Sequence, residues 1–521
     1  MAAASSLPPQ SSDAQRNRRG LLWITGAKAF FIASSYGTQL VLPRLLGTVA
    51  DFGLFATAMN VVSILNNVLI ASTLQSVSKF VSGAEDHASA ILRQSLRWQA
   101  LLSLAIGGAL WALAPWLSSR VLLDPKLSTM LRIASVVVGS YAIYASAIGY
   151  LNGRRRFRAQ AQFDIGFSTL RTLGILGAAA LGFGATGAFT GLAASAFLIM
   201  LSSVLYVGLG RPGEAPQLRS WLAFAAPLAF YQICLNGVLQ LDLAVAKRVV
   251  AEIALERGSA PEAAARLASQ YAGYYRAAQT FAFIPYQLIN SVTFIVFPAV
   301  ARVAALGDVK QARDTVRAAM RGSLLALLAI AAPVAGASSG VMRLAYPEVY
   351  VASAPALSVL IFGIVAFSLF AIASTLLNGL GRPLLSATVA AIASALVVFA
   401  DTAALRWGPL SEERSLASLA LATSLGMLFA LVLAGGVLYR TTSAFLPWRT
   451  LLRASVATLL AYFSAHLLPH GRPLQALLAL ALAEGVFLGS LWLLGEAEVH
   501  ERRVLSSFWQ KLRARSPRPP G

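Results

Sequence analysis

Apolar residues in this chain come in blocks of roughly 20 residues. One block runs from Leu474 to Leu494, and another begins at Leu324 and continues beyond Ala335. Such a block is long enough to cross the hydrocarbon core of a bilayer as a helix. Short polar segments with Lys and Arg separate the blocks. The pattern therefore predicts an all-α, polytopic membrane protein with about 14 transmembrane helices.

The expected spans can be placed to within a few residues. They are 21–43, 53–78, 98–118, 129–151, 163–182, 187–209, 220–241, 271–298, 322–342, 355–379, 384–405, 415–438, 450–468 and 473–494. The apolar stretch after the polar first 20 residues is longer than a signal-peptide core, so we expect it to remain as the first helix.

Lys and Arg are concentrated in alternate loops. With the N-terminus inside, the inward loops carry roughly twice as many of these residues as the outward loops. This bias predicts that both termini face the cytoplasm. The largest outward loop, residues 244–270, has nearly balanced charge, which agrees with that orientation.

Composition supports the membrane assignment and narrows the chemistry. The chain is 57% hydrophobic and 12% charged, whereas soluble domains carry about a quarter charged residues. The net charge of +21 lies mostly in short loops, where it orients helices and binds anionic headgroups, so we expect membrane lipids and not nucleic acid as its partner. The single Cys234 excludes an intramolecular disulfide, and we expect no metal site, cofactor or nucleotide-driven step.

Two pairs of short stretches recur in the same order. Gly53–Ala58 opens the second span and Gly273–Ala278 opens the eighth, while Leu151-Asn152-Gly153 ends the fourth and Leu377-Asn378-Gly379 ends the tenth. An offset of six spans is even, so it predicts parallel repeats related by an axis along the membrane normal. Two six-helix lobes with a cleft between them are typical of alternating-access transporters.

This repeat sets the expected domain boundaries. They are 1–20 for a cytoplasmic N-terminal tail, 21–209 for an N-lobe, 210–219 for a linker, 220–438 for a C-lobe, 439–495 for two extra helices, and 496–521 for a basic amphipathic cytoplasmic tail.

Several short motifs resemble those of a known family. Leu42-Pro43-Arg44-Leu45-Leu46-Gly47 followed by Phe52-Gly53-Leu54-Phe55 is similar to the opening signature of Wzx-type polysaccharide flippases, as is the eighth span from Tyr274 to Phe297-Pro298. That family belongs to one superfamily with the MurJ lipid II flippases and the MATE drug exporters. A departure is the stretch Glu252–Ser269, which is longer than is usual there.

The resemblance implies a V-shaped, MATE-like cleft and a location in the cell inner (cytoplasmic) membrane. It implies flipping of an undecaprenyl-diphosphate-linked oligosaccharide repeat unit from the inner to the outer leaflet, for O-antigen, exopolysaccharide or capsule synthesis. A polysaccharide polymerase and chain-length or export proteins are then the expected protein partners. Neither the particular sugar nor the oligomeric state follows from these motifs.

Ionisable residues inside spans usually face a cavity or a partner. Lys28, Arg171 and Arg276 lie in the first, fifth and eighth spans, and such cations can hold a lipid diphosphate by charge-assisted hydrogen bonds. Neutral polar residues there would pair with sugars. The candidate substrate-binding residues are Lys28, Arg171, Arg276, Gln279, Asn290, Asn67 and Gln39. The alternative for each cation is a helix-packing pair or a side chain that extends to the headgroups.

Three acidic residues are candidates for coupling transport to an ion gradient: Asp242, Asp401 and Glu484. Asp242 could instead neutralise Lys247 or Arg248, and Glu484 could pair helices. Protons, sodium or consumption of the product remain open as the driving force.

Two other functions compete with flipping. A MATE-type, cation-coupled exporter of cationic drugs would need an acidic cleft, whereas the clearest central charges here are Lys28 and Arg171. A polytopic glycan polymerase or glycosyltransferase would need an acidic pair on an outward loop for metal or base chemistry. The first outward loop offers only Asp51, and the long one offers Glu252, Glu256 and Glu262 among basic residues. We therefore expect a transporter and not an enzyme.

Overall fold

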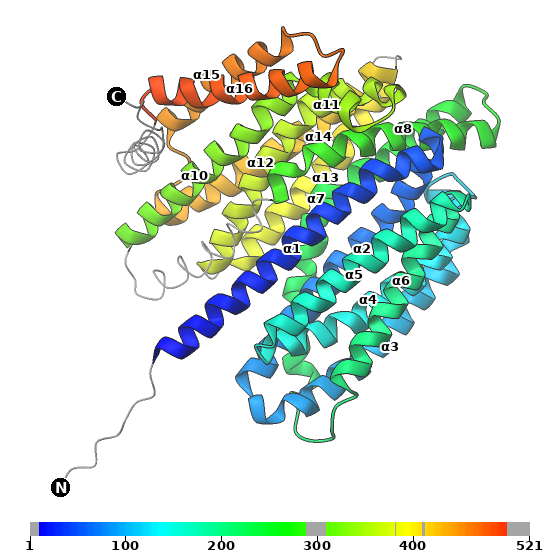
Figure 1. Ribbon diagram of the computed structural model, residues 1–521, viewed down its shortest axis with the longest axis vertical. Helices are drawn as coiled ribbons and strands as arrows, with labels where there is room; N and C mark the ends of the chain where they lie inside the picture. Colours follow the sequence, from blue (N-terminus) through cyan, green and yellow to red (C-terminus); the bar gives the residue numbers. More distant parts are fainter. Residues whose placement is uncertain (1–9, 288–308, 381, 409–411, 497–521) are drawn as a thin grey trace, which may run out of the picture. The chain divides into compact units, whose positions relative to one another are not determined.

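The protein is all-helical throughout the residues that the computed structural model describes, which are 10–287, 309–380, 382–408 and 412–496 (Figure 1). The longer helices are α1 Gln10–Leu46, α2 Val49–Gly83, α3 Ala88–Trp116, α4 Leu127–Gly153, α5 Phe157–Ala180, α6 Gly184–Val207, α7 Leu218–Glu256, α8 Pro261–Ala282, α10 Val309–Gly336, α12 Ala354–Gly379, α13 Pro383–Trp407, α14 Glu412–Thr442, α15 Trp448–His466 and α16 Pro473–Leu493. Short elements are η1 Glu85–His87, η2 Leu117–Val121, α11 Ser338–Ala345 and η3 Glu348–Ser353.

Each of the expected spans falls on helix, except for the part of the eighth span in residues 288–298, which lies outside the described residues. Ten of the described helices are long and apolar enough to cross a membrane. Helices α1, α5, α8 and α15 are not in this set. In α1, α5 and α15, polar and charged residues such as Lys28, Arg171 and Arg453 interrupt the apolar stretches. The polytopic all-α class is therefore confirmed, whereas the count of fourteen spans is not.

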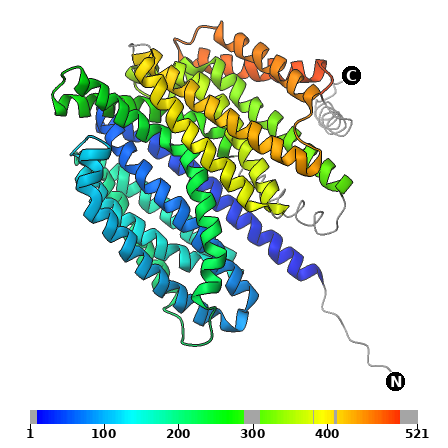
Figure 2. The same cartoon turned by 180° about the vertical axis from the view of Figure 1, so that it is seen from behind.

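The chain forms two compact units, each described here by itself. The first comprises Met1–Thr280 and Pro383–Ala430, and the second comprises Phe281–Arg382 and Leu431–Gly521. In the first unit α4 packs against α2, α3 and α6, and α5 packs against α1 and α6 (Figure 1). Helix α7 packs against α2 and also against α13 (Figure 2).

Glycines allow the closest helix contacts in the first unit. A Cβ atom at Gly153 would lie 2.7 Å from Cβ of Val81, so α4 approaches α2 more closely than any other residue would permit. Likewise Gly174 of α5 and Gly191 of α6 face one another through their backbones. Such small residues drive helix association where apolar burial offers little advantage.

The Leu-Asn-Gly turns form in the same way in both predicted repeats. The backbone N–H of Arg156 donates to the carbonyl of Leu151, and that of Arg382 donates to the carbonyl of Leu377. In the first turn Asn152 also accepts from Ser78 at 2.7 Å, which ties α4 to α2. The shared cap geometry supports the repeat, although the lobe boundaries remain a prediction.

A second observation also supports the repeat. Gly53 in α2 and Gly273 in α8 are repeat counterparts, and they pack directly against one another: a Cβ atom at Gly53 would lie 2.7 Å from the backbone nitrogen of Gly273. Equivalent residues meet each other only close to a two-fold axis. The contact is therefore the one expected if this axis passes between α2 and α8.

The expected outward loop, residues 244–270, is instead helical for most of its length. Helix α7 continues to Glu256, α8 begins at Pro261, and only a short turn joins them. Hydropathy marks only the apolar part of a helix, and the Ala, Glu, Leu and Arg residues that follow Ala244 all favour helix continuation. The long insertion is thus a helical hairpin.

In the second unit α10 packs against α12, α15 and α16. Glu496, just after α16, joins three of these helices. Its carboxylate accepts hydrogen bonds from Arg321 of α10 at 2.9 Å and from Thr450 and Arg453 of α15 at 2.6 and 3.1 Å. The cluster fixes the end of α16 against its neighbours.

Candidate functional site

Arg171 is a cation in the middle of α5 whose hydrogen-bonding capacity is only partly used. It projects from α5 toward α1, where it donates to the hydroxyl of Ser35. Its guanidinium lies 4.6 Å from the ring centre of Phe31 and 5.8 Å from that of Phe167. Its Nε atom is buried and has no hydrogen-bond partner, and no carboxylate forms an ion pair with it among the described residues.

Gln39 lies one helical turn beyond Ser35 on α1. Its Oε1 atom is also buried without a hydrogen-bond partner in the described part of the chain. The neighbouring α1–α5 contacts are made by hydroxyls, Ser34 with Ser168 and Thr38 with Thr172. A free donor at Arg171 and a free acceptor at Gln39 therefore flank a polar interface, and a ligand with both phosphate oxygens and hydroxyl groups could satisfy both.

Lys28 lies further toward the N-terminus of α1, and its charged neighbour is Asp164 of α5. Asp164 also accepts a hydrogen bond from Tyr144 of α4 at 3.3 Å. Sequence reasoning missed Asp164, although it is a carboxylate within the fifth predicted span and that position alone could have singled it out. Lys28 thus has a carboxylate nearby, which distinguishes it from Arg171.

A second polar cluster surrounds Asp242 of α7, which is fully buried. Its carboxylate accepts hydrogen bonds from Tyr275 and Gln279 of α8, both at 2.9 Å, and from the backbone of Leu243 at 2.8 Å. Arg276 interacts with it electrostatically. The alternative in which Asp242 neutralises Lys247 or Arg248 is wrong, because those residues pair with Asp124 and Glu252.

Asp401 of α13 belongs to the same cluster. It is fully buried, accepts from Thr423 of α14 at 2.8 Å, and has one carboxylate oxygen, Oδ2, without a partner among the described residues. Thr423 lies 3.2 Å from the hydroxyl of Tyr275, which in turn reaches Asp242. The structure therefore brings the first two coupling candidates together through Tyr275 and Thr423, neither of which the sequence had indicated.

The other predicted site residues have different surroundings. Arg276 donates to Gln279 at 3.5 Å, so these two candidates adjoin the Asp242 cluster. Asn67 of α2 donates to Asn236 of α7 at 2.7 Å and so contributes to helix packing. Asn290 lies outside the described residues. Glu484 lies on α16 of the second unit and is half-buried. The expectation that Lys28 and Arg276 face one shared cavity stays a prediction.

Comparison with known proteins gives these clusters a family context. A family profile described as "Polysaccharide biosynthesis protein" matches residues 18–304, more than half of the chain. The chain belongs to this polysaccharide biosynthesis protein family. The match confirms the family that the motifs at Leu42–Gly47 and Phe52–Phe55 had indicated. No curated protein matches the chain by sequence.

Solved structures share the fold at low sequence identity. The lipid II flippase MurJ in an inward closed conformation is 15% identical, with a TM-score of 0.70, over 90% of this chain and 99% of its own. A eukaryotic MATE transporter is 16% identical, with a TM-score of 0.59, over 90% and 99% of the two chains. An outward-facing multidrug resistance MATE transporter of the MOP superfamily is 15% identical, with a TM-score of 0.56, over 81% and 95%.

These neighbours show that this member of the family has the MOP-superfamily fold. Together with the ten apolar helices, the shared fold supports a multi-pass membrane protein. Within that fold the signature residues are structural. Leu42 and Phe52 are fully buried, and Phe55 packs edge-to-face on Phe189 with the ring centres 5.8 Å apart.

Proposed function

We propose that this protein flips an undecaprenyl-diphosphate-linked oligosaccharide from the inner to the outer leaflet of the cytoplasmic membrane by alternating access. The family and the fold support a lipid-linked substrate in general terms. The observation that carries the more specific proposal is Arg171, a cation in the expected fifth span with a free donor and no acidic partner among the described residues.

An unpaired cation inside a membrane protein needs a compensating anion. Burying a charge is unfavourable unless it is paired and hydrogen-bonded, so such a residue most often marks a ligand site. A diphosphate supplies pairs of acceptor oxygens that the two parallel N–H donors of a guanidinium can bind together. The aromatic faces of Phe31 and Phe167 hold Arg171 in place when the anion is absent.

Gln39 extends the site toward the sugar. Its free Oε1 accepts hydrogen bonds and would pair with a hydroxyl group, which a lipid-linked oligosaccharide carries next to its diphosphate. Lys28 lies on the same helix and adds positive charge, partly balanced by Asp164. An exporter of cationic drugs would have no use for an unpaired arginine at this position.

The test is flipping of a fluorescent lipid-diphosphate oligosaccharide in proteoliposomes, read out by a membrane-impermeant quencher. We expect Arg171→Gln to flip at least about tenfold more slowly, because a charged hydrogen bond contributes roughly 1.5–3 kcal/mol. Arg171→Lys should retain part of the rate, since charge is kept and the planar fork is lost. The matched control is Arg132→Gln, an exposed arginine that lies 5.0 Å from the ring of Trp111. Equal rates for Arg171→Gln and Arg132→Gln would contradict the proposal.

Asp242 and Asp401 are proposed as the coupling site of the same transporter. Two buried carboxylates linked through Tyr275 and Thr423 carry more negative charge than Arg276 balances, so one of them is expected to take up a proton or to bind a further cation. The free Oδ2 of Asp401 is where either would bind. Glu484 remains a candidate with no contact of this kind among the described residues.

Coupling is tested by imposing a proton gradient or a sodium gradient separately on the same proteoliposomes. We expect one of the two to accelerate flipping by the wild type and neither to accelerate Asp401→Asn. Ser394→Ala, which removes a hydroxyl elsewhere on α13, is the control and should respond like the wild type. A full response of Asp401→Asn to either gradient would exclude the pair from coupling.

A further inference from the structure

Lys247 is a fully buried lysine that the substrate site and the coupling site leave unused. Its ammonium group donates to Asp124 at 2.7 Å, to the carbonyl of Ala265 at 2.9 Å and to the hydroxyl of Ser269. The Lys247 side chain is 0% exposed and that of Asp124 is 3% exposed. All three ammonium hydrogens are therefore satisfied, and the ion pair is sealed from solvent.

The ion pair connects parts of the chain that belong to different predicted repeats. Asp124 lies between η2 and α4, whereas Lys247 is near the end of α7 and Ser269 is in α8. Ser269 also contacts α2, because its carbonyl oxygen would lie only 1.7 Å from a Cβ atom added to Gly53. The ion pair and the Gly53–Gly273 contact of α2 with α8 are thus continuous through one residue.

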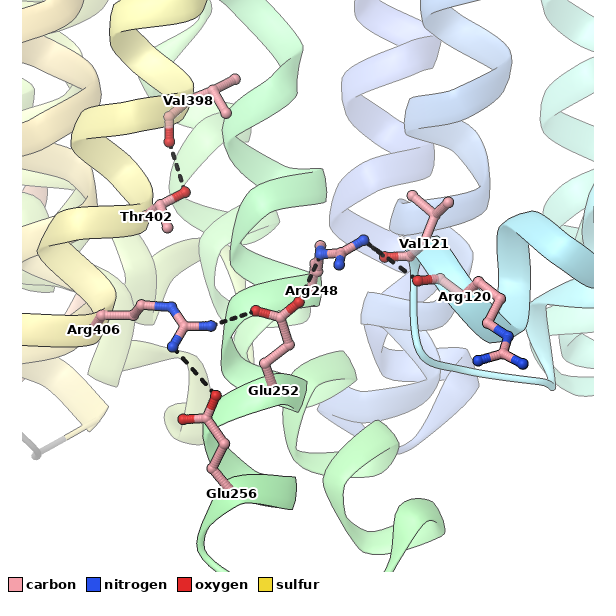
Figure 3. Close-up of polar contacts among 8 residues, drawn as sticks. All are labelled: Arg120, Val121, Arg248, Glu252, Glu256, Val398, Thr402 and Arg406. Atoms are coloured by element: carbon pink, nitrogen blue, oxygen red, sulfur yellow. Dashed lines mark hydrogen bonds and ion pairs between the residues drawn. The ribbon is translucent and has the colours of Figure 1, made fainter.

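Charged residues extend the same contact to the surface (Figure 3). Arg248, next to Lys247, donates to the carbonyls of Arg120 and Val121 at 3.3 and 3.4 Å and to Glu252 at 2.7 Å. Arg406 of α13 completes the network by donating to Glu252 at 2.7 Å and to Glu256 at 3.2 Å. The insertion Glu252–Ser269, which begins in the last turns of α7, therefore supplies both carboxylates of this network.

All these contacts lie at one end of the helices, where α2, α4 and α8 begin and α7 ends. The orientation predicted from Lys and Arg makes this the outward end. The contact of α2 with α7 near their other ends is different in kind. Phe80 stacks on Trp221 there with the ring centres 4.9 Å apart, Lys79 lies 3.7 Å from the ring centre of Phe224, and no ion pair joins the two helices among the described residues. Ionic groups regain hydration when they separate, whereas separated apolar faces do not. The outward contact is thus the one suited to repeated opening.

We propose that Asp124, Lys247 and Ser269 form a releasable latch that closes the outward end of the transport pathway between the first repeat and the α7–α8 hairpin. The proposal rests on the alternating-access function above. Substrate release to the outer leaflet requires the latch to separate, and its reformation resets the transporter. The surface network of Arg248, Glu252 and Arg406 holds the hairpin in position for that step.

The test measures opening directly by thiol labelling. Cys234→Ala removes the natural cysteine, and Thr57→Cys introduces one in α2, one turn beyond Gly53, where the side chain is 1% exposed. A membrane-impermeant maleimide is added from outside. We expect slow labelling with the latch intact, and labelling about tenfold faster or more with Lys247→Met, because the lone Asp124 carboxylate would favour the hydrated, open state. The exposed Lys126→Met nearby is the control and should label at the intact rate.

A double variant separates a latch from a structural ion pair. Asp124→Leu with Lys247→Met replaces the pair by apolar side chains, a change that is often neutral or stabilising for folding. For a latch, we expect this variant to unfold no more easily, to label more slowly than the intact protein, and to flip lipid more slowly because the end stays closed. For a purely structural pair, labelling and flipping would both match the intact protein, and that result would overturn the proposal.

The labelling arm needs no substrate, so it separates this proposal from the proposed function. Faster labelling of Lys247→Met without any lipid flipping by the intact protein would keep the latch and reject the flippase. Flipping by the intact protein with unchanged labelling in both variants would reject the latch alone. Labelling of Lys247→Met only from the cytoplasmic side would also overturn it.

Discussion

Arg171 and Lys247 are both cations inside the first compact unit, but their surroundings differ. Lys247 has a carboxylate, a carbonyl and a hydroxyl for its three hydrogens, whereas Arg171 has one hydroxyl, two aromatic rings and a free Nε. A fully paired charge has no capacity left for a ligand, so it can only stabilise one arrangement of helices. A partly paired charge is poised to bind. A charged residue inside a membrane protein thus indicates a binding site only when its hydrogen-bond and ion-pair partners leave part of its capacity unused.

The largest expected effect comes from Lys247→Met. It leaves the Asp124 carboxylate buried and unpaired, and breaking a buried pair in this way destabilises by about 3–5 kcal/mol. Thermal unfolding in detergent should show this loss. Lys126→Met is the control, because an exposed lysine contributes within about 0.5 kcal/mol. If Lys247→Met unfolds like Lys126→Met, the contrast between the two buried cations does not hold.

Arg171→Gln should give the opposite result. No carboxylate among the described residues loses its partner, so we expect the free energy of unfolding to fall by only about 0.5–1.5 kcal/mol, the net contribution of one hydrogen bond such as that to Ser35. Binding of the lipid diphosphate should weaken about ten- to hundredfold, since one charged hydrogen bond is worth roughly 1.5–3 kcal/mol. Equilibrium binding to detergent-solubilised protein measures the second quantity. A large loss of stability together with unchanged binding would show that Arg171 is a structural cation.

The sequence predicted the fold of this protein better than it predicted the contacts within the site. The apolar blocks located the helices because a stretch of about twenty apolar residues is stable in a membrane only as a helix. The residue types of the turn at Leu151-Asn152-Gly153 were sufficient to identify the similar turn at Leu377-Asn378-Gly379. Partners were harder to predict. Asp124 meets Lys247 across more than a hundred residues of chain, and no periodicity links them. The same is true of Asp401 and Tyr275, which meet through Thr423.

Glu496 offers a smaller test of a paired charge, now outside the spans. Burial alone would raise the pKa of Glu496, but hydrogen bonds from Thr450, Arg321 and Arg453 outweigh it and hold that pKa below its usual range. The unfolded chain therefore binds a proton more readily than the native one. The stabilisation is present above the unfolded pKa of about 4.3 and is lost as the pH falls through the lower native value.

Glu496→Gln should remove about 1–2 kcal/mol of stability at pH 7 and show a smaller further loss between pH 5 and pH 3 than the wild type. Thermal unfolding across that range provides the measurement. The control is Glu348→Gln, whose side chain is 72% exposed while it pairs with Arg343 at 3.1 Å, and which should change stability by less than about 0.5 kcal/mol. Identical acid profiles for Glu496→Gln and the wild type would contradict the role of the cluster.

Phe31→Leu is expected to have the smallest effect, and it tests what holds Arg171 when no ligand is bound. The ring of Phe31 lies 4.6 Å from the guanidinium, and a cation–π contact of this kind contributes about 0.5–1 kcal/mol. Leucine keeps the apolar volume and removes the ring face, so we expect the KM for the lipid substrate to rise about two- to fivefold with kcat unchanged. The control is Trp111→Leu, which removes the same kind of contact from Arg132 at 5.0 Å. That variant should leave KM unaltered, because Arg132 is exposed and lies outside the cluster. A fall in kcat for Phe31→Leu at constant KM would instead place the aromatic contact in the conformational step and not in the binding of the anion.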